Sequence, residues 1–243
     1  MTLKKLINDI EDLEKKYKKH RKNLINCKIN YEFESQDGGF YPVTKKPTIV
    51  TGITATQNAG STNSDYYYTI DGGGINGAFK QQYKKCNIDI SKLNDKIEHP
   101  KDNEFQYKNS LVKIPENKCK LAEYMMYSVG PNMSGETSFT EENKEIIKKI
   151  YRDAMDIIIK HNNELSEEHI TCFRVTFLSA GIYAPKFKNN EQYEQFMEEL
   201  IELIINSMLD RLICDDNKHL KTLLFQKKAI DKYSDLIINL FKN

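Results

Sequence analysis

The chain has 243 residues, long enough for one domain with a sizeable buried core. Its 36 Lys and Arg residues against 35 Asp and Glu residues give a formal net charge of +1, so overall charge gives no support to a nucleic-acid partner, although a local basic patch stays open. The five cysteines are widely spaced and form no C-x-x-C pair, which favours reduced thiols over a disulfide framework or a zinc site.

The first predicted element is an amphipathic helix within residues 1–26. Apolar residues recur there at steps of three and four, with Lys and Glu between them: Leu3, Leu6, Ile7, Ile10, Leu13 and Tyr17. The segment lacks a continuous apolar run, which argues against a signal peptide or a membrane span. We expect this helix to pack on a domain formed by residues 27–243, in an intracellular, monomeric protein with no membrane partner.

Predicted strands and helices alternate along the rest of the chain. Turn signals and β-branched or aromatic runs predict strands at residues 28–34, 48–53, 66–70, 112–114, 121–129, 172–178 and 219–226. Apolar stripes predict helices through residues 146–158, 190–209 and 228–241, the first of them capped by Ser138 and Glu141 as a capping box. This alternation predicts an α/β fold with helices on both faces of a mixed or mostly parallel sheet.

A glycine-rich stretch, TIDGGGINGAF at residues 69–79, is the first candidate for a binding loop. Glycines let the main chain approach phosphate oxygens closely, and the N–H groups at a helix start carry partial positive charge. A tight turn without a ligand would also use these glycines. Gly72, Gly74 and Gly77 match the dinucleotide pattern G-x-G-x-x-G, but they lie far from the first predicted strand and lack the acidic residue that usually follows.

A second stretch of small residues, SAGIYAPKF at residues 179–187, follows the apolar strand predicted at 172–178. The carboxyl ends of strands are where open α/β sheets bind ligands. Two such loops can hold the two phosphates of one diphosphate from opposite sides.

Three separated motifs, taken together and in this order, resemble the macrodomains, a family that binds ADP-ribose. GGGINGAF at 72–79 is similar to the family's first loop, YSVGPN at 127–132 to its strand ending in V-G-P, and LSAGIYA at 178–184 to its second loop. The resemblance covers about residues 28–242. It implies a three-layer α/β/α sandwich with a mixed central sheet and an extra N-terminal helix. It also implies ADP-ribose or ADP-ribosylated protein as the partner, with no cofactor and no metal.

The same resemblance implies which residues bind the ligand. Backbone amides of the first loop would contact one phosphate and the distal ribose, and those of the second loop would wrap the other phosphate. Tyr183 would offer an aromatic face to the ribose, or else pack on the edge of the sheet. The full set is Gly72, Gly73, Gly74, Ile75, Asn76, Gly77, Ser179, Ala180, Gly181, Ile182 and Tyr183.

Two asparagines are the candidate catalytic residues. Asn76 stands where many hydrolytic macrodomains have an aspartate that orients or activates water, and an amide cannot act as a general base. Asn58, in QNAGS, is the match to the family's ribose-binding asparagine, although thirteen residues separate it from Gly72; Asn63 is the alternative.

Other polar residues give weaker signals. Gln81 and Gln82 stand where the poly(ADP-ribose) glycohydrolase branch has acids, which argues against cleavage of poly(ADP-ribose) chains. Asp37 is a poor local match to an aspartate that contacts adenine in the family. The histidines show no metal-ligand spacing: His20, His99, His161, His169 and His219.

Three functions stay open at this point. The resemblance favours a hydrolase that releases mono-ADP-ribose from modified proteins, or acts on a related ADP-ribose derivative, with a substrate phosphate positioning the water. The alternative is a non-catalytic reader of ADP-ribose or ADP-ribosylated protein. A degenerate macrodomain used for protein contacts is the third. An acidic residue beside the distal ribose would favour the hydrolase over the reader, and the motif contains none.

Overall fold

A computed structural model of the chain provides the fold. It describes residues 53–62, 68–70, 74–101, 104–115, 122–164, 167–212, 214, 216–220, 222–225 and five positions between 232 and 240. The predicted N-terminal helix, the strand predicted at 28–34, and Gly72, Gly73, Asn63 and Asp37 lie outside the described residues. Among the described helices, none is long and apolar enough to cross a membrane.

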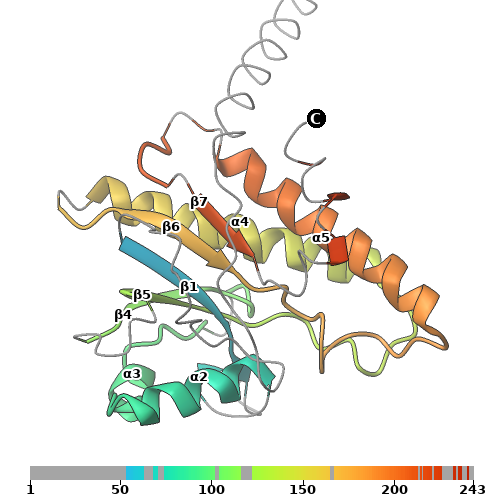
Figure 1. Ribbon diagram of the computed structural model, residues 1–243, viewed down its shortest axis with the longest axis horizontal. Helices are drawn as coiled ribbons and strands as arrows, with labels where there is room; N and C mark the ends of the chain where they lie inside the picture. The colour runs from blue at the N-terminus through green and yellow to red at the C-terminus, as the bar shows by residue number, and fades with distance from the viewer. Residues whose placement is uncertain are drawn as a thin grey trace, which may run out of the picture.

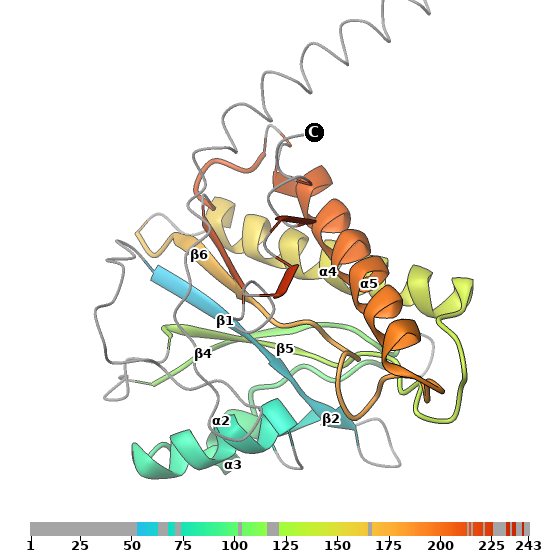
Figure 2. The ribbon, with the colours of Figure 1, turned by 45° about the vertical axis from the view of Figure 1, so that its right-hand side comes forward.

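The central element is a five-stranded sheet with the order β4-β5-β1-β6-β7. The strands are β1 (Ile53–Ala59), β4 (Ser110–Lys113), β5 (Tyr124–Ser128), β6 (Ile170–Val175) and β7 (Thr222–Phe225). β1 runs parallel to both β5 and β6, β6 runs parallel to β7, and β4 is antiparallel to β5. The predicted mixed sheet is therefore confirmed, with β1 between β5 and β6 (Figure 2). A separate pair joins β2 (Ser61–Thr62) to β3 (Tyr68–Thr69), the latter within the strand predicted at 66–70.

β1 differs from the sequence prediction. The predicted strand covers residues 48–53, whereas β1 begins at Ile53 and continues to Ala59, over residues for which the sequence predicted no strand. The reason is the polar sequence of β1: Thr54, Thr56, Gln57 and Asn58 are all buried. A strand flanked by two other strands and two layers of helices has no solvent face, so these polar side chains form hydrogen bonds inside the protein.

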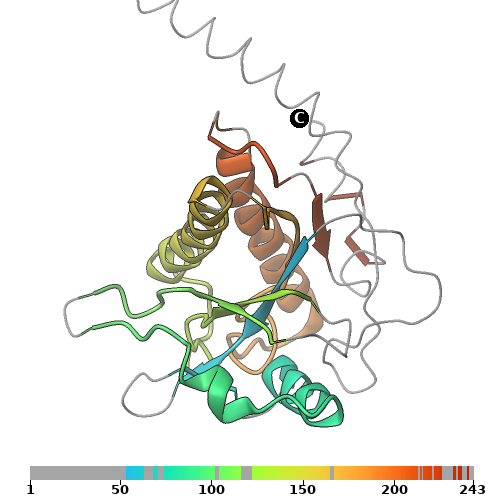
Figure 3. The same cartoon turned by 90° about the vertical axis from the view of Figure 1, so that its left-hand side faces the viewer.

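Helices cover both faces of the sheet, as the alternation predicted. α4 (Glu141–Glu164) and α5 (Asn190–Leu212) lie side by side on one face, and α2 (Gly74–Lys85) and α3 (Ile90–Asn94) cover the other (Figures 1 and 3). The result is the three-layer α/β/α arrangement. α4 matches the predicted stripe at 146–158 and α5 the helix predicted at 190–209. At positions 232, 233, 235, 236 and 240 the chain is helical, within the helix predicted at 228–241.

The predicted cap of α4 is wrong by two residues. Thr140, not Ser138, is the residue that caps the helix: the amide of Asn143 donates to Thr140 Oγ1 over 3.3 Å, and the amide of Lys144 donates to the Thr140 carbonyl over 3.0 Å. Ser and Thr both accept such hydrogen bonds at a helix start, so sequence alone offered two candidates.

Strand alternation divides the interior into two apolar clusters. On the face under α4 and α5, Ala55, Met126 and Phe173 pack with apolar residues of both helices. On the opposite face, Met125 and Tyr127 pack with Phe79 and Tyr83 of α2. Neighbouring residues of β5 therefore point into different cores, as the two-residue period of a strand requires.

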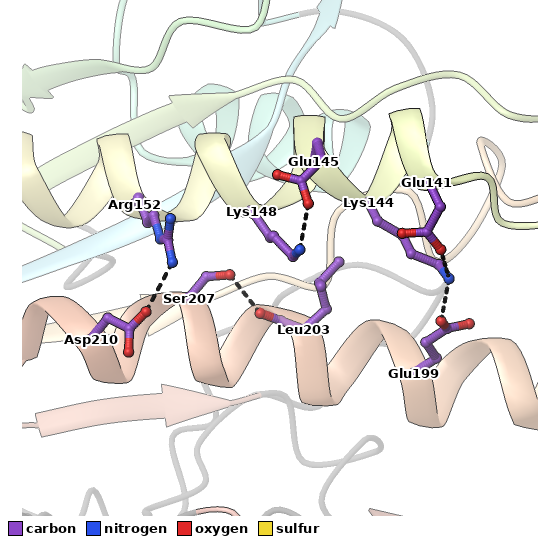
Figure 4. A network of polar contacts seen from close by, with 9 residues as sticks. All are labelled: Glu141, Lys144, Glu145, Lys148, Arg152, Glu199, Leu203, Ser207 and Asp210. Carbon is purple, nitrogen blue, oxygen red and sulfur yellow. Dashed lines mark hydrogen bonds and ion pairs between the residues drawn. The ribbon is translucent and has the colours of Figure 1, made fainter. Parts of the chain in front are cut away.

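Ion pairs join α4 to α5 along their exposed sides (Figure 4). Lys144 of α4 pairs with Glu199 of α5, and Arg152 pairs with Asp210 over 2.9 Å. Their side chains are partly exposed, and pairs of this kind contribute little to stability. The packing of α4 against α5 rests mainly on the apolar stripe beneath these pairs.

Cysteine usage departs from the expectation at one position. Cys86, directly after α2, is disulfide-bonded, whereas Cys172 and Cys214 are free thiols. Cys172 is fully buried in β6, as a small core residue. The expectation of reduced thiols is therefore right for these two and wrong for Cys86.

Candidate functional site

The candidate site lies at the carboxyl ends of β5, β1 and β6. These strands are parallel neighbours, so the segments that follow them emerge at the same edge of the sheet. The segment after β5 contains Gly130 and Pro131, and the one after β6 contains residues 179–183, which we call the second loop. The first loop is residues 72–77, of which 74–77 are described and form the start of α2.

Gly74 begins α2 with a backbone φ of +59°. This left-handed conformation suits glycine and is strained for residues with a side chain. At the start of a helix the first amides have no acceptor within the helix, and Gly74 and Ile75 find none elsewhere in the described part of the chain. The first turn of α2 contains no acidic residue that would offset the partial positive charge of the helix start.

The second loop begins with another left-handed residue, Ser179, whose φ is +61°. The buried Ser179 hydroxyl donates to the Pro131 carbonyl over 2.8 Å, which fixes the loop to the segment after β5. The amides of Gly181 and Ile182 have no acceptor among the described residues. Ile182 is 70% exposed, which is unusual for a large aliphatic side chain.

The two loops lie against each other although 108 positions separate Gly74 from Ile182 in the chain. A Cβ atom placed on Gly74 would lie 3.5 Å from Cδ1 of Ile182. Ile75 of the first loop and Tyr183 of the second pack against the same apolar cluster. Tyr183 therefore packs at the sheet, which is one of the two roles considered for it. The residue is half-buried and stays partly exposed.

The two candidate catalytic residues are in direct contact. Asn58, near the end of β1, donates from Nδ2 to Oδ1 of Asn76 in α2 over 3.1 Å, and both side chains are buried. Although thirteen residues separate Asn58 from Gly72, Asn58 therefore still lies beside the first loop, at Asn76. Asn58 Oδ1 and Thr56 Oγ1, two positions earlier, are buried and have no hydrogen-bond partner among the residues that the structure describes. This polar patch is neutral: it can hold a hydroxyl group, but it offers no base of ordinary strength.

Gly130 of the V-G-P motif explains why the segments after β5 and β6 can lie so close. A Cβ atom at position 130 would overlap Ser179 Oγ and would lie 3.0 Å from Leu178 Cβ and 3.2 Å from the Ser179 amide nitrogen. Further along these segments, the Met133 amide donates a hydrogen bond to the Tyr183 carbonyl over 2.9 Å. Glycine at 130 therefore permits the approach that shapes the second loop.

Gln81, Gln82, His169 and His219 lie away from these loops. Gln81 is exposed and Gln82 donates to Cys86 Sγ over 3.7 Å, about two turns and roughly 10 Å along α2 from Gly74. His169 and His219 stack with ring centroids 3.6 Å apart, just before β6 and β7 begin, at the opposite end of the sheet. Within the described residues no group of three His, Cys, Asp or Glu side chains is arranged to hold a metal ion.

Two hollows of the described surface lie elsewhere. One of about 420 Å³ lies between α4 and α5, and one of about 620 Å³ lies further along the same helices. Charged side chains line both, and several of these already form ion pairs, such as Arg152 with Asp210. We interpret both hollows as solvent-filled grooves between helices, because neither is lined by the glycine loops or by a buried polar group that lacks a partner among the described residues.

Sequence reasoning missed several residues that lie in or support the candidate site. Thr56 and Gln57 were not recognised because their strand was not, and Tyr151 was read only as part of an apolar stripe. The tyrosine hydroxyl is nevertheless fully buried and accepts a hydrogen bond from the Leu178 amide, the residue just before the second loop. The available signal was a run of polar residues, TATQN, between two small apolar segments.

Comparisons with known proteins give one kind of match. No protein-family model matches the sequence, and no curated protein matches it. Among solved structures, the chain is similar to a Trypanosoma brucei macrodomain in complex with ADP: 16% identity and a TM-score of 0.47, over 76% of this chain and 63% of that one. It is also similar to an Oceanobacillus iheyensis macrodomain mutant with ADPR, at 15% identity and a TM-score of 0.47, over 79% of this chain and 88% of that one.

The fold and the loops together define an α/β protein with a candidate two-loop site at the carboxyl ends of parallel strands. The two solved structures named above are macrodomains. The residues of the candidate site are those that the loop geometry of this chain brings together.

The close approach of Gly130 to the second loop leads to a prediction about stability. Gly130→Ala should lower the free energy of unfolding by about 1–3 kcal/mol, because the added methyl group must displace Ser179 or Leu178. Gly135→Ala is the matched control, since a Cβ atom there would have nothing within 4 Å. Chemical denaturation of both variants measures the difference, and equal stabilities would show that the segments do not pack as described.

Proposed function

We propose that the chain binds ADP-ribose, with its diphosphate held between the first and second loops. The observation that carries this proposal is the close approach of Gly74 to Ile182, which brings together two sets of backbone amides that have no acceptor among the described residues. An anion at a helix start is favoured by the exposed N–H groups and by the helix dipole. The second loop offers the amides of Gly181 and Ile182 from the other side, so two phosphates in sequence suit the site better than one.

The position of the asparagine pair supports a sugar next to the diphosphate. Asn76 lies in the first turn of α2 and contacts Asn58, whose Oδ1 is a buried acceptor without a donor in the described part of the chain. A buried acceptor of this kind is costly unless a partner arrives, and a ribose hydroxyl is a suitable donor. The sequence resemblance to macrodomains implies the same ligand. Intracellular location and a monomeric state remain predictions from the sequence.

The first test compares ligands that carry different parts of ADP-ribose. We expect ADP-ribose to bind with a Kd in the micromolar range, about −8 kcal/mol, and AMP to bind at least roughly tenfold more weakly because it lacks the second phosphate and the distal ribose. Isothermal titration calorimetry measures both. Equal affinities for AMP and ADP-ribose would show that the two loops do not act together on a diphosphate.

The second test fills the space in front of the second loop. Gly181→Val should weaken ADP-ribose binding by roughly tenfold or more, because the isopropyl group occupies space in front of the exposed amides. A Cβ atom at Gly181 has nothing within 4 Å, so the fold should tolerate it. Gly74→Val is less informative, since the left-handed conformation of Gly74 would make any side chain there strained.

Gly135→Val is the matched control for this experiment, because it adds the same group at another open glycine outside both loops. The two variants should melt at similar temperatures, and only Gly181→Val should lose affinity. Unchanged affinity in Gly181→Val would move the site away from the second loop.

We further propose that the protein slowly hydrolyses mono-ADP-ribose esters. Holding water and substrate in a reactive orientation lowers a barrier by several kcal/mol without any base. Asn58 and Asn76 would orient the distal ribose and the water, and a phosphate of the substrate would help to position that water. Because Asn76 replaces a carboxylate, the reaction is expected to be slow.

An assay on a protein automodified on carboxylates tests this second proposal. We expect slow release of ADP-ribose above the spontaneous rate and no shortening of poly(ADP-ribose) chains. Asn58→Ala should lower the rate more than the affinity, because its contact matters most in the transition state. Retained ADP-ribose binding with no release would make the protein a reader of the modification and would exclude the hydrolase.

A further inference from the structure

A continuous path of buried hydrogen bonds runs beneath the candidate site, from the surface of α4 to the second loop. Its side chains come from elements that are distant in the sequence, and each is almost completely buried: Gln57, Asn109, Ser128, Tyr151 and Thr176. None of them belongs to either loop. The path therefore connects α4 and the sheet to the second loop through side chains that do not face a ligand.

The first half of the path crosses the sheet. Asn109, just before β4, donates from Nδ2 to the carboxylate of Asp153 and to the Ile150 carbonyl, both over 2.8 Å. Its Oδ1 accepts a hydrogen bond from the Ser128 hydroxyl at the end of β5. Ser128 Oγ in turn accepts a hydrogen bond from Gln57 Nε2 of β1 over 3.0 Å.

The second half reaches the second loop. The Thr176 amide donates to Gln57 Oε1 over 3.1 Å, and the Thr176 hydroxyl donates to the Gln57 carbonyl over 2.7 Å. Tyr151 of α4 then bridges the turn after β6: its hydroxyl donates to the Thr176 carbonyl and accepts from the Leu178 amide, the latter over 2.9 Å. Leu178 directly precedes Ser179, the left-handed first residue of the second loop.

The Tyr151 hydroxyl is suited to this bridging role because it stays neutral. Burial raises its pKa well above the usual range, although the Leu178 amide acts in the opposite direction. A neutral hydroxyl both donates and accepts, and here each capacity is used by a main-chain group on either side of Phe177. Removal of the hydroxyl would leave one buried amide and one buried carbonyl without this partner, which favours a different path of the chain at residues 176–178.

We propose that Tyr151 is a positioning residue for ligand binding: through Thr176 and Leu178 it sets the start of the second loop, so that the Gly181 and Ile182 amides face the diphosphate. The inference rests on the proposed function for its ligand. It adds that α4, which contributes no residue to the site itself, controls the geometry of one phosphate contact.

Tyr151→Phe tests the proposal, with Tyr124→Phe as the matched control. Both tyrosines are buried, and the Tyr124 hydroxyl donates to Glu168 near the start of β5 and β6, at the opposite end of these strands from the loops. We expect Tyr151→Phe to weaken ADP-ribose binding by roughly tenfold, the effect of one lost well-placed hydrogen bond, and Tyr124→Phe to bind as the wild type does. Thr176→Val, which removes only the hydroxyl bonded to the Gln57 carbonyl, should weaken binding in the same direction and replaces Tyr151→Phe if that variant does not fold.

Amide hydrogen exchange without ligand provides a readout that does not depend on the proposed function. Exchange at Leu178 and in residues 179–183 should be faster in Tyr151→Phe than in the wild type, and unchanged in Tyr124→Phe. If the wild type does not bind ADP-ribose, the proposed function fails, while exchange still tests the positioning role. If Tyr151→Phe lowers the melting temperature but leaves both affinity and loop exchange unchanged, Tyr151 serves stability alone and the inference is overturned.

Discussion

The hydrogen bonds of the Gln57 side chain hold together the three strand ends on which the candidate site is built. From β1 this one amide reaches the Ser128 hydroxyl of β5 and the Thr176 amide just beyond β6. A two-residue alternation places Gln57 on the same face as Ala55, among apolar residues under α4. A polar group in that position is stable only if its hydrogen bonds are all made, so it fixes the relative positions of its partners.

The two loops derive their geometry from this arrangement. With the ends of β5 and β6 fixed, Gly130 allows the segments after them to touch, and the Ser179 hydroxyl ties them together at Pro131. Ser179 adopts a left-handed backbone, which costs about 1–2 kcal/mol for a residue with a side chain. Its hydrogen bond and the bridge formed by Tyr151 offset that cost and keep the following amides in place.

The described part of the site is polar but carries no charged side chain among its proposed contacts. Backbone amides of α2 and of the second loop, together with the Asn58 and Asn76 pair, are all neutral groups held by the fold. Fixed dipoles of this kind stabilise a charged ligand without the reorganisation that water or flexible lysines would need. Charged residues on the exposed sides of α4 and α5 pair with each other instead (Figure 4).

The sequence by itself determined the long helices α4 and α5, the strands β5, β6 and β7 to within a few residues, the mixed sheet and the two glycine-containing loops. These features follow from local periodicity and from the backbone needs of glycine, which neighbouring residues express directly. Tertiary structure alone decided that Thr140 caps α4, that TATQN is a buried strand, that Asn58 contacts Asn76, and that Gly74 lies against Ile182. In each of these cases the structure depends on a hydrogen bond or contact between residues that only the folded chain brings together. The polar residues of β1 illustrate this, because a buried polar strand and an exposed loop have the same sequence pattern until the hydrogen-bond partners are known.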